Sequence, residues 1–154
     1  GIASGDYVFA ARDNGSGGFV TDTTLASTAT AGATTLALTA APADTPVAPG
    51  AKACYIRVNG KPHTYTARSG NTITGLSPAV PVGGYASGLP VIIPFIDGVS
   101  SGASMQSANF QFGSGFTVRY RVRHGSTPSI VPFESTLAVT SNGGSGTAVR
   151  NADE

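Results

Sequence analysis

A G-x-S-x-G pattern at Gly98–Gly102 is the first feature that could carry chemistry, with Ser100 in the position of a nucleophile. Such a serine needs a strand before it and a helix after it, and an acid and then a histidine must follow it in the chain. The residues after the pattern, ASMQS, are few and polar. No acid lies between Ser100 and His124, and no histidine follows His124. The pattern is therefore typical of chance in a chain rich in Gly and Ser.

The histidines and the cysteine do not form a metal-binding pattern. His63 and His124 are the only histidines, and neither has a carboxylate or a cysteine at the spacing of a metal ligand. A zinc site needs three or four such ligands. A single cysteine, Cys54, excludes an internal disulfide and a Cys-rich zinc site. We therefore expect no cofactor, and we expect each histidine to be a surface residue or a hydrogen-bonded polar residue.

The carboxylates are scattered along the chain. The loop that starts at Asp13 has the opening of a calcium loop, but Gly15 and Gly17 occupy positions where oxygen ligands are needed. A plain turn is the better interpretation. A glycosidase needs two paired carboxylates, and nothing selects two of the eight in this chain. The absence of Trp also removes the usual platform for stacking a sugar.

The most organised charge is the row Arg119, Arg121 and Arg123, which a strand with period two places on one face. Like charges in a row repel each other, so something must compensate them. One interpretation is a solvated face that also blocks aggregation at a sheet edge. Another is a contact with a carboxylate-rich neighbouring subunit, because guanidinium groups suit bidentate pairing. Nucleic-acid binding is disfavoured, because the chain has no wider basic patch.

The composition defines the elements that must position these residues. The chain has 154 residues, of which 40% are hydrophobic and only 11% are charged, with 21 Gly, 10 Pro and a net charge of +1. This profile favours many short strands joined by tight turns. The longest apolar run, Leu89–Ile96, is short and broken by two prolines, so we expect no membrane span.

The clearest strands lie in the middle of the chain. Cys54, Ile56 and Val58 alternate with polar residues, and Asn59-Gly60 is a strong two-residue hairpin signal. The sequence predicts an all-β fold, an antiparallel β-sandwich or barrel, built as one domain or as two small β modules. In the second case, residues 1–97 form an N-terminal β-meander, residues 98–108 a linker-like segment and residues 109–154 a C-terminal sheet.

Residues 31–94 resemble a motif that is common in virion proteins of tailed bacteriophages. A TTL-type strand, a VNG turn, a YT strand, a GNTITG hairpin and a G-x-x-V strand follow one another, here at Thr34–Leu36, Val58–Gly60, Tyr65–Thr66, Gly70–Gly75 and Gly88–Val91. Residues 118–154 also resemble such accessory proteins. One departure is Lys61, where members of this class often have an acid after the turn.

The resemblance implies a non-enzymatic structural protein located in the virion. The favoured role is a capsid decoration or accessory protein that stabilises the particle through repeated subunit contacts. Its expected partners are major capsid, neck or tail subunits and further copies of itself, without a membrane or a specific nucleic acid. We expect Arg119, Arg121 and Arg123 to form a polar contact strip, and the loops around Asn59-Gly60 and Tyr85 to be exposed recognition tips. The segment Pro90–Ile96 could pair with a neighbour at a sheet edge.

Two alternatives belong to other functional classes. A receptor- or glycan-binding module of a tail or fibre predicts that Tyr55, Tyr65, Tyr85 and Tyr120 cluster near exposed loops. A small serine hydrolase predicts a reactive Ser100, and it is the least favoured of the three.

Overall fold

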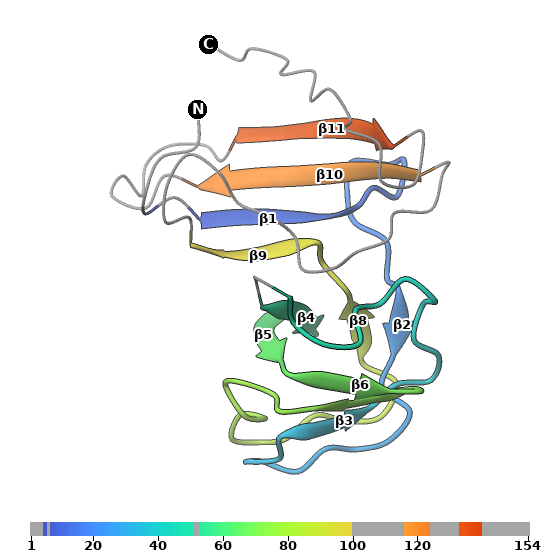
Figure 1. The fold of residues 1–154 in the computed structure, drawn as a ribbon, viewed down its shortest axis with the longest axis vertical. Coiled ribbons are helices and arrows are strands. Elements are labelled where there is room, and N and C mark those ends of the chain that lie inside the picture. Colours follow the sequence, from blue (N-terminus) through green and yellow to red (C-terminus); the bar gives the residue numbers. More distant parts are fainter. Residues whose placement is uncertain (1–4, 6, 51–52, 100–115, 124–132, 140–154) are drawn as a thin grey trace. The chain divides into compact units, whose positions relative to one another are not determined.

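The computed structural model describes residue 5 and residues 7–50, 53–99, 116–123 and 133–139. Within these ranges the chain forms strands, turns and loops and no helix (Figure 1). The strands are β1 (Tyr7–Arg12), β2 (Thr23–Thr24), β3 (Thr35–Ala37), β4 (Cys54–Val58), β5 (Lys61–Tyr65), β6 (Ala67–Ser69), β7 (Thr72–Thr74), β8 (Pro90–Ile92), β9 (Ile96–Val99), β10 (Phe116–Arg123) and β11 (Phe133–Val139). They form three antiparallel sheets, which confirms the predicted all-β fold. No sheet in these ranges closes into a barrel.

The chain divides into two compact units. Among the described residues, a central unit comprises Thr21–Ile93, and a discontinuous unit comprises the residues up to Val20 together with those from Pro94 onward. This division differs from the predicted modules 1–97 and 109–154. The reason is that β1 pairs with β10, so the two ends of the chain share a sheet. Residues 98 and 99, which the sequence analysis placed in a linker, belong to β9.

The discontinuous unit contains one four-stranded sheet in the order β11-β10-β1-β9 (Figure 1). Strand β1 lies in its interior, and four successive residues of that strand, Val8 to Ala11, are buried. A strand buried on both faces reads as a continuous apolar run, as the sequence VFAA does. Strand β10 lies between β1 and β11, so the interpretation of the arginine row as protection of a sheet edge is wrong.

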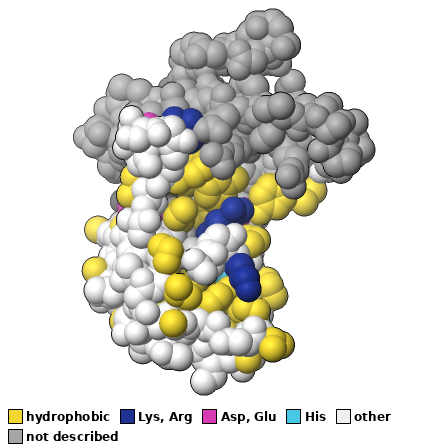
Figure 2. Space-filling view, turned by 180° about the vertical axis from the view of Figure 1, so that it is seen from behind, with side chains coloured by type: hydrophobic (Ala, Val, Ile, Leu, Met, Phe, Trp, Pro, Cys, Tyr) yellow, Lys and Arg dark blue, Asp and Glu magenta, His cyan; other side chains and the backbone are white. Residues whose placement is uncertain are grey.

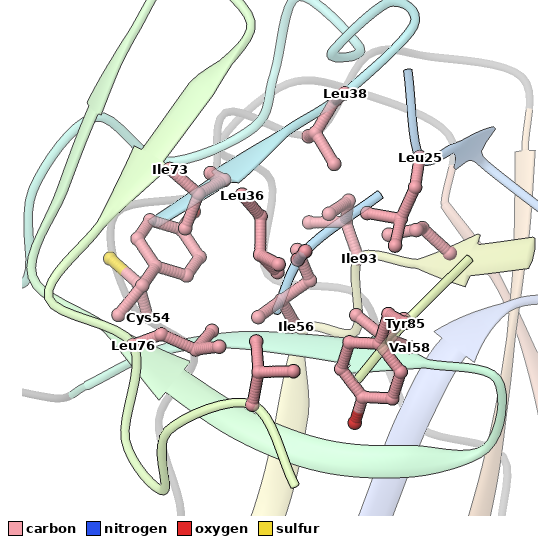
Figure 3. Close-up of a cluster of buried hydrophobic side chains, with 14 residues drawn as sticks. Leu25, Leu36, Leu38, Cys54, Ile56, Val58, Ile73, Leu76, Tyr85 and Ile93 are labelled. Atoms are coloured by element: carbon pink, nitrogen blue, oxygen red, sulfur yellow. The ribbon is translucent and has the colours of Figure 1, made fainter. Parts of the chain in front are cut away.

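The central unit is sandwich-like, with two small sheets around one core. The sheets have the orders β2-β8-β4-β5 and β3-β7-β6. Side chains from both enter the same apolar cluster, shown in Figure 3, with Leu36 and Ile73 from one sheet and Ile56 and Val58 from the other. The predicted inward face of Cys54, Ile56 and Val58 is confirmed, because all three are fully buried.

The hairpin between β4 and β5 has the predicted turn. Asn59 and Gly60 both have positive φ, at 47° and 79°, and Val58 pairs with Lys61 across them. Two central residues with positive φ are the mark of a type I′ turn, whose twist matches that of the flanking strands. The register Cys54↔Tyr65 and Ile56↔His63 follows from this turn.

In the described residues, the apolar run Leu89–Ile96 reaches a sheet edge only at its last residue, Ile96, which begins the edge strand β9. The run is divided between β8 and β9, which lie in different units. Strand β8 is paired on both sides, with β2 and with β4, so the expected edge pairing of Pro90–Ile96 with a neighbour is wrong for β8. Pro90 is tolerated because it is the first residue of the strand, where proline costs least.

Candidate functional site

Arg119, the first member of the predicted arginine strip, is engaged within its own unit. Its Nε–H donates to Oδ1 of Asp13 at 2.6 Å, and its side chain is only 15% exposed. The other carboxylate oxygen of Asp13 accepts a hydrogen bond from the backbone N–H of Gly15 at 3.1 Å. The carboxylate thus joins β10 to the turn that follows β1. The interpretation of the row as a solvated face is wrong for Arg119.

Arg121 and Arg123 are placed by the backbone of β10 alone, because their side chains lie outside the described part of the structure. Arg121 pairs in register with Phe9 of β1 and with Glu134 of β11. Arg123 pairs with Tyr7. The residue in register with Arg121 on β11 is therefore an acid, and the compensation of the repeated charge stays a prediction. A contact role for these two residues stays a prediction.

The predicted tip at Asn59-Gly60 is exposed, as is the following residue, Lys61. The backbone N–H of Asn59 donates to the carbonyl of Pro90 at 2.9 Å, which ties the tip to β8. Figure 2 shows that charged side chains are few on one face of the described surface, where white and yellow atoms predominate. A contact at this tip would involve Asn59, the backbone of Gly60 and the charged side chain of Lys61. Its role in recognition stays a prediction.

Tyr85 is not an exposed tip, and this expectation is wrong. Its side chain is 3% exposed and belongs to the core cluster of the central unit (Figure 3). Two backbone hydrogen bonds with Ala29, both 2.8 Å long, hold it in place. Gly83 and Gly84 precede it with positive φ, and this turn directs the tyrosine inward. The residue left at the tip is Val82, which is 97% exposed.

His63 and Tyr85 form a buried polar pair. Nδ1 of His63 lies 2.7 Å from the carbonyl oxygen of Pro78, and Nε2 lies 2.7 Å from the hydroxyl of Tyr85. A carbonyl can only accept, so Nδ1 carries the proton in the neutral ring, and Nε2 accepts from the tyrosine. Burial raises the pKa of the Tyr85 hydroxyl, which keeps this donor protonated. Both ring nitrogens serve the fold, as expected for a hydrogen-bonded histidine.

Cys54 and Tyr65 form a second buried pair, on adjacent strands β4 and β5. Burial raises the pKa of the Cys54 thiol, and its hydrogen bond with Tyr65 opposes this effect. Burial also raises the pKa of Tyr65, whose hydroxyl donates to the carbonyl of Pro46 at 2.8 Å. A neutral, enclosed thiol is a poor nucleophile. The described residues also contain no group of three or more potential metal ligands.

Arg68 has a role that the sequence analysis missed. Its Nε and Nη2 donate to the carbonyl of Thr45 at 3.2 and 2.9 Å, and Nη1 donates to the carbonyl of Gly70 at 2.7 Å. The guanidinium thus fixes the proline-rich loop before β4 to the turn after β6. No signal in the sequence pointed to this role, because Thr45 lies 23 residues before Arg68. Arg68 therefore stabilises the scaffold through three hydrogen bonds to backbone carbonyls.

The tyrosine cluster expected of a glycan-binding module is absent from the described residues. Tyr55, Tyr65 and Tyr85 are all buried. The side chain of Tyr120 lies outside the described part, as do Ser100 and His124. Tyr55, Tyr65 and Tyr85 therefore do not form an aromatic platform of the expected kind.

Comparisons with family models, curated proteins and solved structures gave no match to this chain. In the ranges that the structure describes, no helix is long and apolar enough to cross a membrane.

Proposed function

We propose that this chain is a non-enzymatic structural protein of a phage-like virion, acting as a capsid decoration or accessory protein. The support begins with residues 31–94, whose sequence resembles phage virion proteins. That stretch lies within the central unit, Thr21–Ile93, except for its last residue, Pro94, so most of it belongs to one compact unit. Its partners would be major capsid, neck or tail subunits and further copies of the chain.

One observation carries the proposal. In the central unit, several side chains that are reactive or charged hold loops and strands together, and the tips of two tight turns are among the exposed positions. His63, Cys54 and Arg68 each bond to other parts of the unit. Asn59-Gly60 and Val82 remain on the surface, each held by a backbone hydrogen bond at or beside the turn. A rigid scaffold with fixed tips suits a protein that acts by binding across subunit boundaries, where many weak identical contacts give high avidity.

The test is reconstitution on particles assembled without this protein. The purified chain is mixed with such particles and sedimented, and the resistance of the particles to heat is measured with and without it. We expect the chain to sediment with the particles at a fixed stoichiometry and to raise their disruption temperature. Absence of binding would reject the proposal, and binding of the free chain to a host polysaccharide instead would favour the receptor-binding alternative.

The arginine strip is tested with Arg119 left in place, because its replacement would break the pair with Asp13. The variant carries Arg121→Ser and Arg123→Ser, and the control carries Ser27→Ala and Thr28→Ala, two exposed positions outside the strip and the predicted tips. If the strip contacts the particle, the double variant loses binding while the control retains it. Equal binding of both variants would show that Arg121 and Arg123 are not contact residues.

A further inference from the structure

Strand β11 is an edge strand with unusual features for an edge. It contains seven residues, FESTLAV, and it pairs with β10 along its whole length. No described strand pairs with its other side. Proteins usually blunt such edges with proline, lysine, a bulge or a very short strand. The sequence of β11 contains neither proline, lysine nor glycine, and Glu134 is its single charged residue.

We infer that the outer edge of β11 binds the same edge of a second copy of the chain, antiparallel and around a two-fold axis. A two-fold axis perpendicular to a sheet keeps each face of one copy continuous with the same face of the other. Residues that oppose each other across the axis must then point to the same face. Because side chains alternate between the faces, the axis must pass through a residue and not between two residues. The central position of β11 is Thr136, and an axis there opposes all seven residues.

The order of residues in β11 fits this arrangement. An axis at Thr136 opposes Phe133 to Val139, Ser135 to Leu137 and Glu134 to Ala138, and Thr136 meets its own copy. An aromatic residue facing a β-branched one and Thr facing Thr are favourable cross-strand pairs. The single charge, Glu134, faces a small neutral residue and not another carboxylate. The strand is therefore complementary to itself in the register that pairs it fully.

The consequence is one continuous sheet with four strands from each copy. Positions Phe133 and Val139 continue the face of β10 that carries Val122 and Phe116, because these are their partners in register. The self-contact is isologous, so it closes after two copies and leaves no further β11 edge. The inference rests on the proposed function, in which repeated copies act together, and it names one of the contacts between them.

The decisive experiment combines light scattering with a substitution that adds a negative charge beside the two-fold axis. The unmodified chain is expected to show twice its monomer mass of 15.3 kDa. Ala138→Glu would place a carboxylate opposite Glu134 at two symmetric positions, and Ala138→Gln is the neutral control of similar size. Like charges directly opposite destabilise pairing, so we expect the Glu variant to raise the dimer dissociation constant about tenfold relative to the Gln variant. Equal dissociation constants, or a monomeric unmodified chain, would overturn the inference.

Cross-linking checks the register independently of affinity. In a Cys54→Ala background, Thr136→Cys is expected to give a disulfide dimer with oxidised glutathione, which takes up the electrons of the two thiols. Glu134→Cys alone should not cross-link, whereas a mixture of Glu134→Cys and Ala138→Cys chains should. A dimer that fails to cross-link at Thr136→Cys overturns the inference. A monomer that still sediments with particles would overturn the inferred β11 contact and leave the proposed function standing. A cross-linked dimer that binds no particle would support the β11 contact and reject the proposed function.

Discussion

An added methyl group at Gly84 should cause both backbone strain at positive φ and a steric clash, and a second glycine allows the two effects to be separated. Gly84 has φ of +69°, and a Cβ there would lie 2.7 Å from the carbonyl oxygen of Ala29. That oxygen accepts the backbone N–H of Tyr85 at 2.8 Å. The preceding residue, Gly83, also has positive φ, at +96°, but a Cβ there would meet nothing within 4 Å. Gly83→Ala is therefore the matched control for Gly84→Ala.

The magnitudes follow from these contacts. An L-residue held at positive φ costs about 1–2 kcal/mol, and both variants carry that cost. Only Gly84→Ala must also displace the backbone at Ala29, and overpacking of this kind costs about 1–3 kcal/mol more. We therefore expect a loss in the free energy of unfolding of about 1–2 kcal/mol for Gly83→Ala and about 2–5 kcal/mol for Gly84→Ala.

The assay is urea denaturation followed by far-ultraviolet circular dichroism, with hydrogen exchange to assign the transition to the central unit. The slope of the free energy against urea should stay the same in both variants, because the surface exposed on unfolding does not change. Protection of the Ala29 and Tyr85 amides should fall further in the Gly84 variant than in the Gly83 variant, because the Gly84 variant loses more free energy of unfolding. Equal losses in the two variants would refute the reasoning, since the contact with Ala29 would then carry no energy.

Three further predictions concern the buried polar groups. Tyr85→Phe should cost about 1–3 kcal/mol in urea denaturation, because His63 Nε2 loses its buried partner; a loss below about 0.5 kcal/mol would mean that solvent replaces the hydroxyl. Arg119→Met and Asp13→Asn should be coupled by about 1–3 kcal/mol in a double-mutant cycle, because either change alone leaves its half-buried partner uncompensated; strict additivity would contradict the pair. Burial raises the pKa of Cys54 above its ordinary 9.0 and that of Tyr85 above 10.0, so the folded chain keeps protons that the unfolded chain releases. The contribution of these groups to the free energy of unfolding should therefore be constant below about pH 9 and fall as the pH rises further. The fall should be less steep in Cys54→Ala, and a free energy that stays constant to about pH 10.5 would contradict this prediction.

The parts of the fold that the sequence predicted are those with local causes. Asn59-Gly60 defined its own turn, because both residues tolerate positive φ. That turn and the alternation through Cys54, Ile56 and Val58 together define the β4–β5 hairpin and its inward face. Each of these signals lies within a few residues of the structure it determines.

The parts that the sequence did not predict depend on partners far along the chain. Arg119 was expected to be exposed, and its partner Asp13 lies 106 residues away. Tyr85 was expected at a loop tip because glycines surround it, and its burial depends on His63, which comes 22 residues earlier. The division near residue 100 was drawn from composition, which carries no information on the pairing of β1 with β10. Long-range pairing of this kind leaves no periodic trace in the sequence.

The pairing of β1 with β10 also determines the order in which a growing chain can fold. Strand β1 leaves the ribosome before the strands that pair with it: Tyr7 pairs with Val99 and Arg123, which are made about 90 and 115 residues later. The central unit is continuous from Thr21 to Ile93 and can complete its core while the rest is still being synthesised. During that interval β1 is an apolar strand without its partners. We therefore expect the nascent chain to be most sensitive to chaperones between the completion of Ile93 and the synthesis of β10.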